Sequence, residues 1–210
     1  MKARLLAAAS VVLLACVTFA ADKDEGWTPL FNGKDLTGLK VHFKDADKDA
    51  DPKKTFSVKE GALIVSGKPT CYICTDKSYK NYVLRYDWRF PEGSKPDSNS
   101  GLLVHIQPPH KVMPKCVEPQ GRYRDHGKLF LLGGVKGETK FDEKAHAKAL
   151  KPMGQWSTTE VTCAADGSIS VKLNGTPISS GKTDLTSGPI GFQSEGSEVH
   201  FRNIQIKEGK

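Results

Sequence analysis

The segment YVLRYDWRF, residues 82–90, carries side chains that could bind or act on a ligand. Successive side chains of an extended chain point to opposite faces. The aromatic and aliphatic residues therefore share one face, and Arg85, Asp87 and Arg89 share the other. Guanidinium and carboxylate groups can bind hydroxyls and stabilise charge. This polar face is a candidate ligand-binding surface, and the solvated face of a half-buried strand is the alternative.

A second segment, GLLVHIQ at residues 101–107, follows a loop rich in Gly, Pro and Ser. The same alternation places His105 and Gln107 opposite the apolar residues of this segment. If the two segments form adjacent strands, His105 and the two arginines of the first segment converge on one ligand. We therefore expect a sheet with one buried apolar face and one face that carries the charged and polar side chains of both segments.

Glu118 is a further candidate, in the sequence Glu118-Pro119-Gln120. Sandwich glucanases place two carboxylates two residues apart on one strand, and Gln120 stands in the second place here, which disfavours conventional two-carboxylate hydrolysis. A rim carboxylate paired with Lys115 is the alternative role for Glu118. Because proline cannot donate to a strand ladder, we expect an edge strand or a bulge at Pro119.

The charge balance argues against one class of partner. The formal net charge is +7, and removal of Lys2 and Arg4 lowers it to +5, spread along the chain in single lysines. No dense basic patch is interleaved with aromatic residues. Nucleic-acid binding is therefore not expected.

The first residues read as an export signal. Two basic residues precede an apolar run from Leu5 to Val17, which ends in small residues. We expect cleavage after Ala20, which makes residues 1–20 a signal peptide. The apolar run is too short to be a good membrane span.

A lipoprotein signal of residues 1–15 is the alternative, because the sequence LLAC ending at Cys16 resembles a lipoprotein box. Membrane anchoring is expected only if Cys16 carries a lipid. Either route exports the mature chain to the periplasm or the extracellular space. The remainder, residues 22–208, has the size of a single domain with its own core.

Four cysteines belong to the mature chain, and an oxidising compartment permits up to two disulfides among them: Cys71, Cys74, Cys116 and Cys163. The first two lie in TCYICT, which reads as a strand. Three strand steps would put their Cα atoms about 10 Å apart on opposite faces, beyond disulfide reach. The other two form no second close pair, so a cysteine zinc site is not expected.

The charged stretch of residues 44–54, KDADKDADPKK, resembles a calcium loop only in its alternating aspartates. It lacks the glycine and the closing glutamate of such a loop, so we expect a solvated loop. No metal and no cofactor are predicted for this chain.

Short β-type runs recur along the chain and are separated by turn signals. Asp166-Gly167 and Asn174-Gly175 predict tight turns that join three antiparallel strands over residues 157–180. In the final run the apolar parity switches between Arg202 and Asn203, which predicts a β-bulge. One helix is predicted, at residues 142–151. The recurrence of short β-type runs separated by turns is typical of an all-β sandwich or barrel.

Four separated pieces of the chain resemble the 3-keto-disaccharide hydrolase-like domain family, which is abundant in exported bacterial proteins. The pieces are WTPLFNGKDL at residues 27–36, Trp88-Arg89 with Asn99-Ser100-Gly101, Glu118-Pro119-Gln120, and Gly191-Phe192-Gln193 with Phe201-Arg202-Asn203-Ile204. They occur in the family's order and span the mature chain. The resemblance implies a concanavalin A-like jelly-roll sandwich of antiparallel sheets, in agreement with the strand pattern.

The resemblance also implies a reaction. In a 3-keto glycoside the ketone makes the C2 proton removable by one positioned base, the C1 substituent leaves by elimination, and water then adds. One base and one oxyanion stabiliser suffice. Glu118 is the first candidate for the base and His105 the alternative, and Arg89 is the candidate stabiliser.

The remaining candidates would bind substrate. They are Arg85, Asp87, Asn99, Gln107, Gln120, Tyr123 and His126. Tyr123 is an aromatic residue in a polar loop and could stack on a sugar ring. We therefore predict an exported enzyme that cleaves 3-keto glycosides or disaccharides, with a saccharide as its partner. A carbohydrate-binding module without catalysis is the competing prediction.

Overall fold

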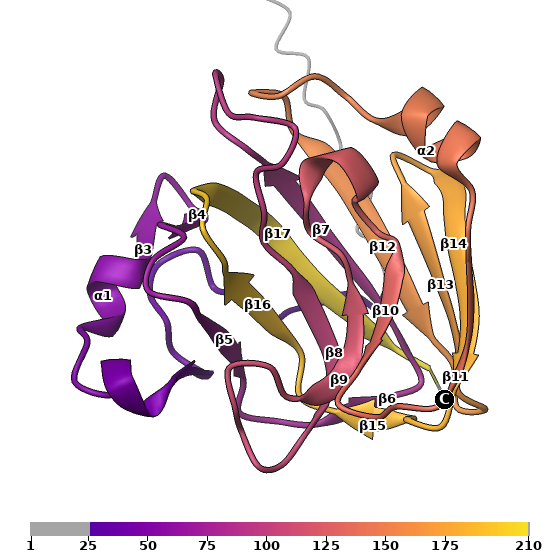
Figure 1. The fold of residues 1–210 in the computed structure, drawn as a ribbon, viewed down its shortest axis with the longest axis horizontal. Helices are drawn as coiled ribbons and strands as arrows, with labels where there is room; N and C mark the ends of the chain where they lie inside the picture. Colours follow the sequence, from indigo (N-terminus) through magenta and orange to yellow (C-terminus); the bar gives the residue numbers. More distant parts are fainter. Residues whose placement is uncertain (1–25, 210) are drawn as a thin grey trace, which may run out of the picture.

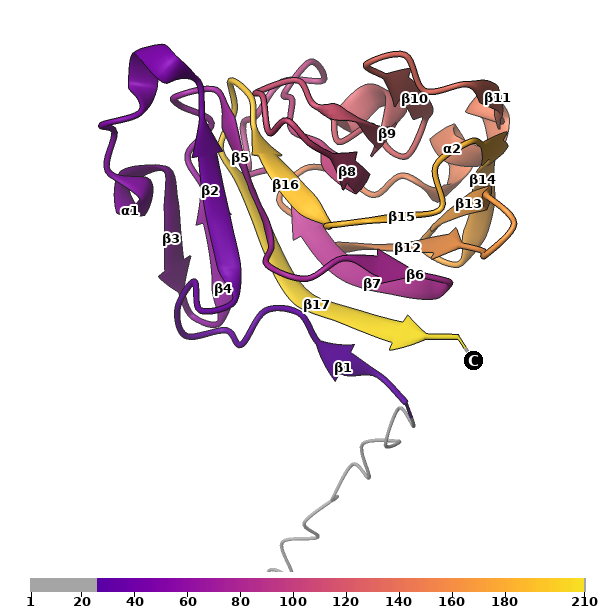
Figure 2. The ribbon, with the colours of Figure 1, turned by 90° about the horizontal axis from the view of Figure 1, so that it is seen from below.

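The computed structural model describes residues 26–209. Two antiparallel sheets lie face to face and form a β-sandwich, which Figures 1 and 2 show from the front and from below. The predicted signal peptide and the alternative lipid attachment site at Cys16 lie outside the described residues. Among the described residues, no helix has the length and apolar character needed to cross a membrane.

The larger sheet has nine strands, and its strand order is β11-β14-β13-β12-β7-β17-β4-β3, with β1 beside β17. These strands span β11 (Gly137–Phe141), β14 (Thr176–Thr183), β13 (Ser168–Leu173), β12 (Ser157–Cys163), β7 (Tyr82–Arg89), β17 (Val199–Glu208), β4 (Ala62–Val65), β3 (Phe56–Lys59) and β1 (Thr28–Pro29).

The second sheet has six strands in the order β10-β9-β8-β16-β5-β2. They span β10 (Leu129–Leu132), β9 (Lys115–Pro119), β8 (Leu102–Gln107), β16 (Gly191–Ser194), β5 (Cys71–Thr75) and β2 (Leu39–Phe43). The short strands β15 (Ser187–Gly188) and β6 (Tyr79–Lys80) pair with each other. The helical segments are η1 (Asp45–Asp47), α1 (Pro52–Thr55), η2 (Tyr123–Asp125) and α2 (Glu143–Ala149).

The core lies between the two sheets and follows the alternation of the strands. Along β7 every second residue is buried, and its aromatic side chains pack against residues of both sheets. Tyr86, for example, contacts Phe192 edge-on, with ring centroids 5.5 Å apart. Each large apolar side chain buried in this way stabilises the fold by about 1.5–3 kcal/mol. The predicted jelly-roll sandwich is thereby confirmed.

Several local predictions are also confirmed. Strands β12, β13 and β14 form the expected antiparallel set, and Gly167 and Asn174 have the positive φ angles of +84° and +49° that their turns require. The register of β17 against β7 shifts after Arg202, and Asn203 has a φ of +51°, so the predicted bulge is present. Helix α2 begins after Asp142, whose carboxylate accepts a hydrogen bond from the backbone N–H of Ala145.

The prediction that residues 82–90 and 101–107 form adjacent strands is wrong. Strand β7 pairs with β12 and β17 in the nine-stranded sheet, whereas β8 pairs with β9 and β16 in the six-stranded sheet. The loop between them crosses from one sheet to the other. Alternation within a strand specifies its two faces but not its neighbours, which depend on long-range pairing.

A bulge also corrects the assigned faces of β8. The pairing of β8 with β9 is irregular between Val104 and Gln107, and His105 has a φ of +56°. Ile106 consequently packs with Leu103 on the outer face of the sheet instead of facing the core. His105 turns inward, since one extra residue in a strand reverses the parity of all that follows.

Two further expectations are corrected or resolved. Strand β9 lies between β8 and β10, so Pro119 stands at the last residue of an inner strand and not on an edge strand. The charged stretch of residues 44–54 contains η1 and the start of α1. The four cysteines of the mature chain are buried and free, and Cys71 and Cys74 face opposite sides of β5, as their spacing predicts.

Candidate functional site

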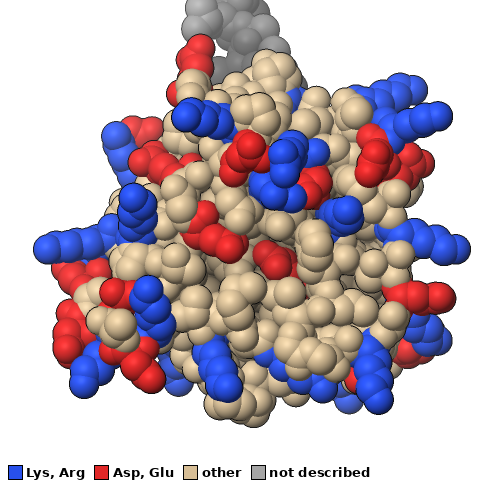
Figure 3. Space-filling view, in the orientation of Figure 1, with Lys and Arg blue, Asp and Glu red and all other residues tan. Residues whose placement is uncertain are grey.

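The outer face of the six-stranded sheet holds Glu118. On β9, Val117 belongs to the core between the sheets, and the alternation of the strand places Cys116 and Glu118 on the other side. Figure 3 views this side of the molecule. It shows acidic side chains near the centre of the face, while most Lys and Arg side chains project from its edges.

Two side chains converge over Gly101, which lies just before β8. Gly101 is opposite Gln120 on one side, and its carbonyl accepts a hydrogen bond from the backbone N–H of Gln193 on the other. A Cβ atom at residue 101 would overlap with Oε1 of Gln193 and would lie 2.5 Å from Oε1 of Glu118. The glycine therefore provides the space in which Glu118 and Gln193 meet.

Burial changes the acid–base behaviour of Glu118. The residue is 5% exposed. Burial, with smaller contributions from Glu195 and Asp125, raises the pKa of Glu118 to about 7. A carboxyl group with such a pKa can both accept and return a proton near neutral pH, which is what a general base requires.

Polar groups surround this carboxyl group. Arg122 donates two hydrogen bonds to the carboxylate of Asp125, 2.8 and 2.5 Å long, and its backbone N–H donates to Oε1 of Gln120. Glu195, on the loop after β16, is half-buried, and burial raises its pKa. The buried Oε1 atom of Gln193 has no hydrogen-bond partner among the described residues.

Two of the predicted binding residues, Asn99 and Gln120, lie in the segments on either side of Gly101 and Glu118. Asn99 precedes Gly101 by two residues, its backbone N–H donates to Oγ of Ser197, and its buried Oδ1 atom has no hydrogen-bond partner among the described residues. Gln120 lies directly opposite Gly101. Oδ1 of Asn99 thus has no partner among the described residues, whereas Oε1 of Gln120 already accepts the hydrogen bond from Arg122.

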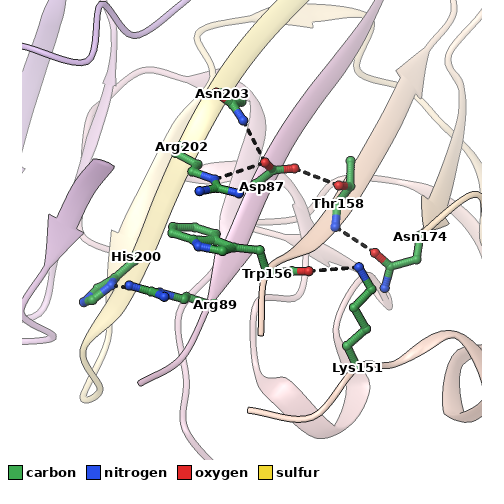
Figure 4. A network of polar contacts seen from close by, with 9 residues as sticks. All are labelled: Asp87, Arg89, Lys151, Trp156, Thr158, Asn174, His200, Arg202 and Asn203. Carbon is green, nitrogen blue, oxygen red and sulfur yellow. Dashed lines mark hydrogen bonds and ion pairs between the residues drawn. The ribbon is translucent and has the colours of Figure 1, made fainter. Parts of the chain in front are cut away.

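Arg85, Asp87 and Arg89 lie on the outer face of the nine-stranded sheet, on the far side of the sandwich from Glu118. Figure 4 shows the network that Asp87 and Arg89 enter there. Asp87 accepts hydrogen bonds from Thr158 and Asn203, 2.7 and 2.8 Å long, and from Arg202 at 3.3 Å.

The two arginines of β7 stack on tryptophan rings. The guanidinium of Arg89 lies 4.6 Å from the ring centroid of Trp156, which Arg202 also covers at 4.0 Å. Arg85 lies 4.2 Å from the ring centroid of Trp27. The predicted convergence of Arg89 with Glu118 is therefore wrong, because the sandwich core separates them.

His105 does not join Glu118 either. Its ring faces inward, edge-on to the buried Tyr82 at 5.8 Å, and its Nδ1 lies 3.2 Å from the carbonyl oxygen of Leu185. Burial lowers the pKa of His105 to about 4. The imidazole is thus neutral at physiological pH and lies on the wrong side of β8 to act on a ligand above Gly101.

The other three predicted binding residues also point elsewhere. Gln107 donates to the carbonyl oxygens of His105 and Ser187. Tyr123 donates to the carbonyl oxygen of Lys151 and packs edge-on against Trp88 and Phe90 in the core.

His126 is a core histidine. It is 1% exposed and stacks on Trp88 with ring centroids 3.9 Å apart. Its Nε2 lies 2.8 Å from Oγ1 of Thr159. Burial lowers the pKa of His126 to about 3, so this ring remains neutral.

Sequence reasoning missed four residues near Glu118: Gln193, Glu195, Arg122 and Asp125. Gln193 had a detectable signal, because in IGFQS it alternates with the apolar Phe192 and belongs to a piece that resembles the family. The other three lie outside the strands, in the loop after β16 and around η2, where strand alternation makes no prediction. Among the described residues, the one group of three side chains that could hold a metal ion is His42, Cys74 and His110.

A sequence model of the 3-keto-alpha-glucoside-1,2-lyase-like domain matches residues 26–207. No curated protein matches the chain.

Several solved structures resemble the fold. A candidate glycosyl hydrolase from Parabacteroides distasonis is 26% identical, with a TM-score of 0.64 over 89% of this chain and 95% of that protein. The carbohydrate-binding module CBM66 from Bacillus subtilis is 10% identical, with a TM-score of 0.58 over 83% and 98%. The β-glucanase of Bacillus licheniformis is 12% identical, with a TM-score of 0.54 over 88% and 97%. The last two likenesses show the fold alone.

Proposed function

Because this chain belongs to the 3-keto-alpha-glucoside-1,2-lyase-like family, we propose that it cleaves 3-keto glycosides or disaccharides by elimination and hydration. The family and the resemblance to a candidate glycosyl hydrolase make it a carbohydrate-related protein. The observation that carries the finer proposal is Glu118, a buried carboxyl group with a pKa of about 7 that meets Gln193 over Gly101.

Glu118 acts as the general base in this proposal. Its carboxylate removes the proton from C2 of the 3-keto sugar, and the electron pair forms the C1–C2 double bond as the C1–O bond breaks. Glu118 passes the proton that it took from C2 to the leaving oxygen and so returns to its carboxylate form. Water then adds to the double bond, with hydroxyl at C1 and a proton at C2, so that the net reaction is hydrolysis.

The amides near Glu118 take the role that sequence reasoning gave to Arg89. Gln193 and Gln120 lie on either side of Gly101 and can hydrogen-bond the ketone and its neighbouring hydroxyls. Donors aimed at the oxygen that gains charge lower the barrier to proton removal. Asn99 adds a further amide at the same end of β8.

The test is a comparison of substrates. The purified mature protein is incubated with a panel of 3-keto disaccharides and with their unoxidised parents, and the released sugar or aglycone is measured. We expect release only from the keto compounds, because the unoxidised parents have no removable C2 proton. Sugar affinity without release from either set would favour the carbohydrate-binding module.

We also propose that the protein is exported. The basic residues and the apolar run at its start support this, although they lie outside the described residues. Mass spectrometry of protein from its natural host should find a mature start at Ala21 or Asp22, or a diacylated Cys16. Protein recovered with Met1 intact would contradict export.

A further inference from the structure

Three side chains from separate segments approach one another on the outer face of the six-stranded sheet. His42 belongs to β2, Cys74 to β5, and His110 to the loop after β8. Their ligand atoms, one from each residue, all lie within 4.8 Å of one another. The cluster lies apart from Glu118, because β8 and β16 run between β9 and β5.

The pairing of the strands brings these side chains close together. His42 is directly opposite Tyr72 in the pairing of β2 with β5, and Cys74 is the next residue of β5 on the same face. The rings of His42 and His110 stack with their centroids 4.2 Å apart and their planes 12° from parallel. Cys74 is buried and His110 is exposed, so the cluster has a closed side and a side open to solvent.

Tyr72 positions one of the histidines. Its hydroxyl lies 2.8 Å from Nδ1 of His110. A histidine that binds a metal through one ring nitrogen usually has its other nitrogen in such a hydrogen bond, which holds the ring and fixes the tautomer. Here the contact leaves Nε2 of His110 for an ion.

The charges around the cluster favour neutral ligands. Among the described residues, no carboxylate forms an ion pair with His42 or His110. A neutral imidazole is the form that binds metals.

We propose that His42, Cys74 and His110 form a binding site for Zn²⁺, with a fourth coordination position open to solvent. Two imidazoles and one thiolate suit zinc, which binds nitrogen and sulfur at about 2.0–2.3 Å in a tetrahedral arrangement. Calcium and magnesium prefer oxygen ligands, which the cluster lacks. The stacked rings must turn to close on the ion, and His110 lies on an exposed loop.

This site goes beyond the proposed reaction. Three strand spacings separate β9 from β5, so Cys74 lies about 14 Å from Glu118 across the sheet. The ion therefore does not take part in proton removal at Glu118. The cysteine spacing in the sequence predicted no zinc site, because two of the three ligands are histidines that only the fold brings to Cys74.

The number of protons that are released when zinc binds can be measured. A cysteine binds zinc as the thiolate, so the thiol must lose its proton when the ion binds. Formation of the zinc–sulfur bond breaks the S–H bond and releases its proton to the buffer. Titration with Zn²⁺ should release about one proton for each ion bound.

The experiment uses reduced protein without a histidine tag and titrates it with Co²⁺, followed by displacement with Zn²⁺. We expect one equivalent to bind, with the thiolate-to-cobalt charge-transfer absorption and the visible bands of a tetrahedral cobalt site. Cys74→Ala should abolish the charge-transfer band, and His110→Gln should weaken affinity at least tenfold. The exposed position of His110 makes that variant safe for folding.

Matched controls accompany both variants. Cys116→Ala removes another buried thiol of the same face, and His200→Gln removes a histidine of β17 in the other sheet. Both should bind cobalt as the parent protein does. A titration without a thiolate band, or a band that survives Cys74→Ala, would overturn the site, whether or not the enzyme is active.

Discussion

Glu118→Gln should lower the turnover of a 3-keto disaccharide by about 10²- to 10⁴-fold, the usual cost of losing a general base. The amide preserves the shape of the side chain and its ability to hydrogen-bond, but it cannot accept the C2 proton. Substrate affinity should change little. Steady-state kinetics and a binding titration with the same sugar measure the two effects separately.

Glu160→Gln is the matched control for this variant. Glu160 lies in β12, on the outer face of the nine-stranded sheet. The variant therefore makes the same chemical change on the opposite side of the sandwich from the Glu118 site. Arg89→Ala should likewise retain turnover, because Arg89 stacks on Trp156 on that same far face. Loss of activity in either variant would contradict the location of the site.

Deuterated water tests the route itself. Removal and return of the C2 proton should leave deuterium at C2 of the released 3-keto sugar. Cleavage without deuterium at C2 would rule out elimination. Direct hydrolysis by Glu118 together with Glu195, whose charge contributes to the raised pKa of Glu118, would then be the better explanation.

Glu118→Gln should also stabilise the folded protein at pH 7 and above. The pKa of Glu118 is raised from its ordinary value of 4.5 to about 7 in the folded state. Below pH 4.5 the carboxyl group is neutral in both states. As the pH rises from 4.5 to 7, the unfolded state loses its proton first, so the folded protein loses about 3 kcal/mol of stability from this group.

Glu118→Gln removes that loss. Its free energy of unfolding should exceed that of the parent by about 3 kcal/mol at pH 8, with a smaller difference at pH 4. For a chain of this length the gain corresponds to roughly 6 to 12 °C in Tm. Calorimetry at pH 4, 6 and 8 checks it, with Glu160→Gln as the control for the substitution itself. An equal Tm difference at all three pH values would show that Glu118 has no raised pKa.

The strands, their faces and several turns could be predicted from the sequence because they depend on local patterns. The alternation in YVLRYDWRF correctly assigns Trp88 to the core and Asp87 to the opposite face. Asn174-Gly175 specifies a turn through backbone conformation alone. The switch in the parity of the apolar residues between Arg202 and Asn203 predicted the bulge at Asn203.

The partners of each strand could not be predicted in this way, and the site depends on them. Nothing within residues 82–107 shows that the chain changes sheets between β7 and β8, so Arg89 was assigned to the wrong face of the sandwich. The bulge at His105 leaves no mark in the sequence, since the apolar alternation continues through it. One irregular residue was enough to turn a candidate catalytic base into a buried, neutral histidine.

Side-chain alternation was enough to predict an antiparallel sandwich with Glu118 and Gln120 on one face of a strand, because alternation is a property of each strand alone. The meeting of Gln193 with Glu118 over Gly101, and the burial that raises the pKa of this carboxyl group to about 7, could not be predicted in the same way. Neighbouring strands, loop positions and the exclusion of water all arise from long-range packing, so they exist only in the folded chain.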